Sequence, residues 1–141
     1  ERYRSKLRGP LADRIDLMLD VTRPDPQVII EGAEGMSSAE LRDYVVRGRA
    51  FRAWRESRMD DADAEVEGDE SRSIDGVVST FGLDEAAEKC VLGLSKRTHL
   101  TGRGIVRLVR IARTIADVAE SERVTQDHVL EAAMYQGRRD Q

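Results

Sequence analysis

The sequence predicts a mainly α-helical fold, for three reasons. Aromatic residues make up only 4% of the 141 residues, so the core must be built from Leu, Ile, Val and Ala, a composition that favours helices. Apolar residues recur at helical spacing over residues 102–120 and fall on one face. Good N-capping residues also precede other helical segments, at Ser37, Asp84 and Thr125.

One strand is predicted before the helices. Residues 15–22 alternate partly between apolar and polar side chains, which is typical of a strand. Pro24 and Pro26 end it because proline cannot donate to a β-ladder, and a loop containing Gly32 and Gly35 follows.

The helices are then predicted in order from their caps. Ser37 and Glu40 have the spacing of a capping box, which opens a helix that runs to about Arg58. Residues 60–70 contain seven acids and no base, so a flexible acidic loop is predicted over residues 59–72. The remaining helices are predicted near residues 73–81, from Asp84 to about Lys96, over residues 102–120, and from Thr125 to about Gln136.

Composition excludes several functional classes. The net charge of −4 argues against a protein that binds nucleic acid over its whole surface. The single cysteine, Cys90, cannot form an internal disulfide, which fits a reducing compartment. No apolar run approaches the roughly 18 residues that span a bilayer. We therefore expect a soluble, cytoplasmic protein with no membrane partner.

The residues of common catalytic sites are missing from the sequence. It has no Gly-x-x-x-x-Gly-Lys-Ser/Thr phosphate loop. His99, His128 and Cys90 are too few for an ordinary zinc site, so no metal site is predicted. The chain by itself is therefore expected to catalyse no reaction.

Arg14 is the first candidate functional residue. It lies in residues 9–17, which read Gly-Pro-Leu-Ala-Asp-Arg-Ile-Asp-Leu, directly before the predicted strand. An arginine at this point can be held at a surface or an interface. The alternative is a surface arginine paired with Asp13 or Asp16.

The start of the helix over residues 102–120 is the second candidate site. A helix N-terminus favours anions, so Arg103 is electrostatically misplaced there unless an anion joins it. Helical spacing puts Arg103, Arg107 and Arg110 in one stripe opposite the apolar face. This stripe is interpreted either as a phosphate contact or as an ordinary solvated face.

The third candidate is the arginine-rich helix that follows Ser37. Its cations include Arg49, Arg52 and Arg55, interleaved with Tyr44, Phe51 and Trp54. Such a mixture can contact a nucleic-acid backbone. The alternative, which the packing intervals of the aromatic residues favour, is a helix with solvated arginines and buried aromatic side chains.

Residues 9–17 resemble the Gly-Pro-Leu-Leu-Asp-Arg-Ile-Asp-Leu signature of the magnesium-chelatase-like AAA+ ATPases, in particular the bacterial competence-protein (ComM-type) branch. The string Ala-Arg-Thr-Ile-Ala-Asp at residues 112–117 and the segment 124–132 resemble the last helices of the same family. Arg8 and Ala12 depart from the family's Ser and Leu, and residues 59–82 fit it poorly.

The resemblance implies specific roles for these residues. It makes Arg14 an arginine finger that acts on the ATP of a neighbouring subunit, and Arg103 a sensor-2-like contact to nucleotide phosphates, with Arg107 as a further contact. It makes Arg113 a structural residue. ATP and Mg²⁺ are the implied cofactors of the full-length parent, although the chain alone is expected to bind neither. The implied partners are neighbouring subunits of a homo-oligomeric ring, such as a hexamer, and DNA.

The resemblance also divides the chain. Residues 1–35 are expected to be the end of the AAA+ core, with a strand remnant of its α/β sheet, and residues 36–141 a helical lid. The chain is thus expected to be a C-terminal fragment of an ATPase that remodels DNA or moves its branches. The alternatives are the lid of a magnesium-chelatase motor subunit in tetrapyrrole synthesis and a non-catalytic helical interaction module.

Overall fold

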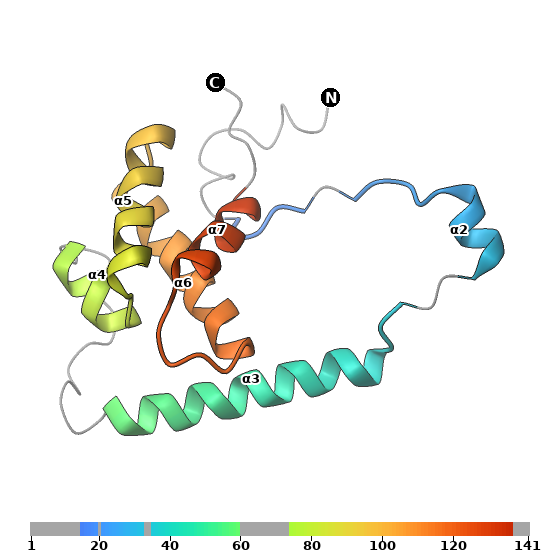
Figure 1. The fold of residues 1–141 in the computed structure, drawn as a ribbon, viewed down its shortest axis with the longest axis horizontal. Coiled ribbons are helices and arrows are strands. Elements are labelled where there is room, and N and C mark those ends of the chain that lie inside the picture. Colours follow the sequence, from blue (N-terminus) through green and yellow to red (C-terminus); the bar gives the residue numbers. More distant parts are fainter. Residues whose placement is uncertain (1–14, 20, 33–34, 60–73, 137–141) are drawn as a thin grey trace.

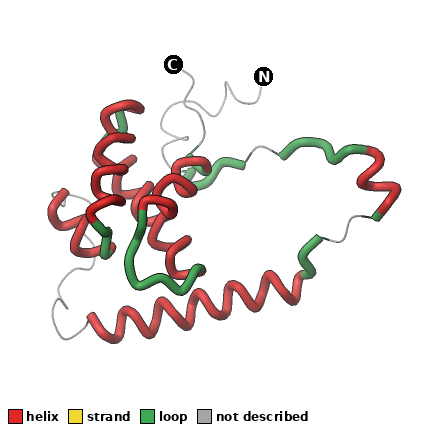
Figure 2. The backbone as a smooth tube through the Cα atoms, viewed as in Figure 1, coloured by secondary structure: helices red, strands yellow, loops and turns green. Residues whose placement is uncertain are grey.

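The computed structural model describes residues 15–19, 21–32, 35–59 and 74–136. Helices dominate this part of the chain, and Figure 2 shows no strand in it. The predicted mainly α fold is therefore confirmed. The predicted acidic loop over residues 59–72 lies almost entirely outside the described residues, as does Arg14.

The helical bundle is built around α6 (Gly102–Val118), which packs against every other helix of the C-terminal part. Figure 1 shows α4 (Ile74–Phe81), α5 (Glu85–Thr98) and α7 (Gln126–Met134) gathered around it, with the long α3 (Ser38–Met59) running beneath. The core contains the apolar residues that helical spacing predicted. Its fully buried members include Leu108, Val109, Ala112, Ala116 and Val129.

Local capping explains where these helices begin. The Asp84 side chain accepts a hydrogen bond from the Ala87 N–H at 2.7 Å. At the start of α3, the Ser37 N–H donates to the Glu40 carboxylate at 2.7 Å, while the Glu40 N–H donates back to the Ser37 hydroxyl at 3.2 Å. This reciprocal pair is the predicted capping box.

The predicted strand over residues 15–22 is wrong for the described part of that segment, residues 15–19 and 21–22, which is irregular. A strand needs a neighbouring strand to satisfy its backbone groups, and the described residues offer none. The segment instead bonds to the bundle. The Met18 N–H donates to the Tyr135 carbonyl at 2.8 Å, and the Ile15 carbonyl accepts from a side chain of α6.

A short helix, α2 (Pro26–Glu31), replaces part of the predicted loop. Asp25 caps it by accepting from the Gln27 N–H at 2.9 Å, and Pro26 occupies the first helical position, where no N–H is needed. Figure 1 shows α2 far from the bundle, and none of its residues is buried. Pro26, which was expected to end a strand, therefore begins a helix instead.

Candidate functional site

The amino end of α6 presents an exposed arginine. The Thr101 hydroxyl caps the helix by accepting from the Gly104 N–H at 3.2 Å. Arg103 lies in the first turn and is exposed, and a Cβ added at Gly102 would meet no atom within 4 Å beyond its chain neighbours and the backbone of its own helix. The helix end therefore has room for an anion beside a guanidinium.

Arg107 does not lie on a solvated stripe with Arg103 and Arg110. It is only 9% exposed, and its Nη1 donates to the Ile15 carbonyl at 2.9 Å. The segment that follows residue 14 covers this side of α6. Helical spacing within α6 alone cannot predict such a contact. The predicted stripe is therefore wrong for Arg107, while Arg103 and Arg110 are exposed as expected.

Arg113 has the predicted structural role. It is 5% exposed, and its guanidinium donates to the carbonyls of Ser121 and Glu122 in the loop after α6. It also pairs with Asp117 at 2.9 Å. Burial lowers the pKa of Arg113, the nearby charge of Arg55 lowers it further, and Asp117 opposes both effects.

A second arginine joins the same carboxylate from α3. Arg55 Nε donates to Asp117 Oδ1 at 3.0 Å, and the two residues are 62 positions apart. Their side chains are only 13% and 7% exposed. Two nearly buried guanidiniums, Arg55 and Arg113, therefore share one nearly buried carboxylate.

The three arginines proposed from the sequence for nucleic-acid contact do not share one surface. Arg49 and Arg52 are exposed, and Arg52 pairs with Glu56 at 2.7 Å, whereas Arg55 points inward to Asp117. Trp54 is 41% exposed, although the favoured interpretation had the aromatic side chains buried. α3 therefore presents aromatic as well as cationic groups to solvent.

A pocket of about 320 Å³ lies beside the carboxyl end of α3. Its walls also come from the turn after α4, from α6 and from the loop after α6. The residues that line it are Trp54, Arg55, Arg58, Phe81, Gly82, Arg113, Glu122 and Arg123. This pocket could not be predicted from the sequence because its walls come from segments that are far apart in the chain.

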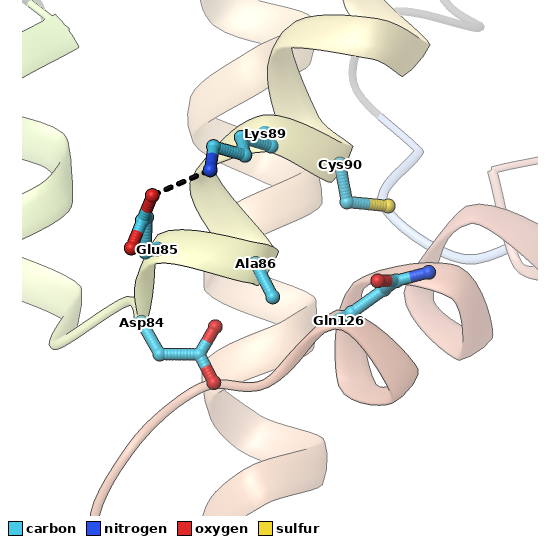
Figure 3. Close-up of a pocket in the computed structure, with 6 residues that line it drawn as sticks. All are labelled: Asp84, Glu85, Ala86, Lys89, Cys90 and Gln126. Carbon is cyan, nitrogen blue, oxygen red and sulfur yellow. Dashed lines mark hydrogen bonds and ion pairs between the residues drawn. The ribbon is translucent and has the colours of Figure 1, made fainter.

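A broader, shallower pocket of about 640 Å³ lies between α5 and α7 (Figure 3). Its polar groups already serve the fold: Lys89 pairs with Glu85, and Asp84 caps α5. Burial raises the pKa of the Cys90 thiol, which disfavours the reactive thiolate. The arrangement therefore suggests no catalytic role.

The described residues form neither a metal-binding cluster nor a membrane-spanning helix. No group of three or more His, Cys, Asp or Glu side chains among them is arranged to hold a metal ion. None of the helices in the described ranges combines the length and apolar character needed to cross a bilayer.

Sequence comparisons identify related proteins. Residues 35–136 match the family described as magnesium chelatase, subunit ChlI C-terminal. The chain is 31% identical over 135 residues to protein YifB of Escherichia coli K12 and 30% identical over 135 residues to competence protein ComM of Haemophilus influenzae; each alignment covers 95% of the chain. A Mycobacterium tuberculosis (strain CDC 1551) protein is 32% identical over 120 residues, or 84% of the chain.

The chain spans about a quarter of the length of these relatives: 25% of YifB, 25% of ComM and 22% of the mycobacterial protein. No solved structure matches it.

Proposed function

Because the chain belongs to the magnesium chelatase subunit ChlI C-terminal family, we propose that it is the helical lid of a ring-forming AAA+ ATPase. The parent protein is a competence-type motor that remodels DNA or moves its branches, in line with the similarity to ComM. Its phosphate loop and Mg²⁺ ligands lie in another part of the same polypeptide.

The amino end of α6 is the observation that carries this proposal. The exposed Arg103 guanidinium and the positive end of a 17-residue helix together suit a phosphate group. ATP supplies the phosphoryl group whose hydrolysis drives the motor. Arg103 binds its phosphates from the lid, so that the lid closes when nucleotide is present.

The contacts of Arg107 support a link between the lid and Arg14. Ile15, which directly follows Arg14, is held on α6 through Arg107, and Met18 is held at the end of α7 through the Tyr135 carbonyl. We assign Arg107 to this backbone contact and not to nucleotide. Arg14 is the arginine finger given to the ATP of a neighbouring subunit.

The experiment compares three variants of the full-length ATPase. Arg14→Ala should lower turnover by roughly 10³–10⁵-fold with nucleotide affinity nearly unchanged, because a finger stabilises charge that develops during phosphoryl transfer. Arg14→Lys should restore little, because an ammonium cannot reproduce the planar guanidinium. Arg103→Ala should instead weaken nucleotide binding about tenfold or more.

Matched controls make this test specific. Lys89→Ala removes an exposed cation from α5 and should change neither turnover nor nucleotide affinity. Mixing Arg14→Ala subunits with phosphate-loop mutant subunits should restore part of the activity, because some interfaces then combine two intact halves. Normal hydrolysis by the Arg14→Ala ring would disprove the finger.

The family description favours a second candidate, the lid of a magnesium-chelatase motor subunit. The two candidates differ in what stimulates ATP hydrolysis. Stimulation by branched DNA supports the competence-type motor, and its absence together with activity in magnesium insertion supports the chelatase.

A further inference from the structure

The pocket at the carboxyl end of α3 has a strong excess of positive charge. Four arginines and one glutamate line it. Asp117, which lies behind Arg55 and Arg113, offsets one more cation, so the pocket and its support retain two net positive charges. Confinement within a protein surface strengthens the attraction of such charges for an anion.

The arginines of the pocket have two different roles. Arg55 and Arg113 are nearly buried and are held by Asp117 and by backbone carbonyls. Arg58 and Arg123 are exposed at its rim, where they can meet a ligand at little cost to the fold. The rim therefore supplies the contacts, and the buried pair supplies a fixed positive field.

An aromatic wall adds a second kind of recognition. Trp54 is 41% exposed, and the Arg58 guanidinium lies over its ring, 5.2 Å from the ring centroid. The Phe51 ring supports it at a centroid distance of 5.1 Å. A nucleobase can stack on an exposed indole, whereas an acidic peptide would use only the arginines.

We propose that this pocket binds single-stranded nucleic acid, with one phosphodiester at Arg58 and Arg123 and the adjoining base against Trp54. The concave shape and the volume of about 320 Å³ suit one unpaired nucleotide, since the bases of a duplex are not available for stacking. This inference rests on the proposed function only for the source of the strand, which is DNA opened by the motor.

Binding is tested on the 141-residue chain with a fluorescein-labelled 12-mer of thymidylate. Trp54 is the only tryptophan, so its fluorescence reports occupancy of the pocket directly. We expect quenching on binding. Arg58→Ala and Arg123→Ala should each weaken binding about tenfold, and each should reduce the slope of log affinity against log salt by about 0.7.

Arg97→Ala is the matched control, because it removes an exposed cation from the carboxyl end of α5. It should change affinity less than twofold, and circular dichroism should show that all variants remain folded. Equal losses in all three variants would overturn the proposal in favour of diffuse attraction. Equally tight binding of a polyglutamate 12-mer, with the same quenching, would overturn it in favour of an acidic protein ligand.

This test can fail independently of the proposed function. The 141-residue chain could show no specific oligonucleotide binding while the Arg14 and Arg103 variants of the full-length protein behave as expected. That result would reject the proposed pocket and leave the proposed function in place. Specific binding by a protein that hydrolyses no ATP would reject the motor and leave the pocket in place.

Discussion

α6 and α3 are the two long helices of the described chain, with 17 and 22 residues, and they are held in different ways. α6 buries a whole face, including Leu108, Val109, Ala112 and Ala116. The only residue of α3 that is buried among those described is Gly48, and Leu41, Val45 and Trp54 are each about half exposed. The length of a helix therefore says little about how much apolar surface it buries.

Two of the contacts between α3 and α6 are particularly close. At Gly48 the backbones approach so closely that an added Cβ would lie 3.0 Å from Val118 Cγ2. Two turns of α3 further on, the Arg55–Asp117 pair bridges the helices at 3.0 Å. We therefore expect loss of the Arg55–Asp117 pair to disturb the position of α3. Truncation of a buried apolar side chain should instead destabilise α6 and the bundle.

The largest effect is expected for Asp117→Asn. It keeps the shape but leaves Arg55 and Arg113 nearly buried without their shared carboxylate, which should lower the free energy of unfolding by about 4 kcal/mol. Urea denaturation measures the loss, and hydrogen exchange should show that α3 loses protection. Glu120→Gln is the control: Glu120 is 51% exposed and pairs with Arg47 at 3.7 Å, so a change within about 0.5 kcal/mol is expected. Unchanged protection of α3 in this variant would show that the Gly48 contact is enough to hold α3 in place without the ion pair.

Leu108→Ala should have the next largest effect. Leu108 is 1% exposed in the centre of the core, so its truncation should leave a cavity and cost about 3 kcal/mol in urea denaturation. Leu130→Ala on α7 is the control, since Leu130 is 43% exposed and should cost less than about 1 kcal/mol. Equal losses at the two positions would contradict the assignment of the core to α6.

The smallest effect concerns the exposed start of α3. Hydrogen bonds from the backbone N–H and the hydroxyl of Ser37 lower the pKa of Glu40 below its ordinary value. A lowered carboxylate pKa means that the capping box stabilises the helix above about pH 4.3, the ordinary value, and that this support is lost as the pH falls through the lowered pKa.

Ser37→Ala removes the hydroxyl contact but keeps the backbone N–H, so the pKa of Glu40 should rise only part of the way to its ordinary value. An NMR titration of the Glu40 carboxyl carbon, in the unchanged protein and in the variant, measures this. An unshifted pKa in the unchanged protein would show that the box does not form in solution.

The comparison of α3 with α6 also separates what could be predicted from what could not. The start of α3, the cap of α5 and the buried face of α6 follow from residues within a few positions of one another, namely Ser37 with Glu40, Asp84 with Ala87, and the apolar spacing of α6. The candidate phosphate site at Arg103 was predictable for the same reason, since it depends only on the start of one helix.

The positions of the main helices and the buried apolar face of α6 follow from local sequence, because helical hydrogen bonds and caps join near neighbours in the chain. Tertiary structure decided that Arg55 turns inward to Asp117, that Ile15 covers Arg107, and that residues 15–19 form no strand. Each of these outcomes depends on a partner tens of residues away or on the lack of a neighbouring strand among the described residues. The sequence states which side chains are charged, but which group each one pairs with depends on how the helices pack.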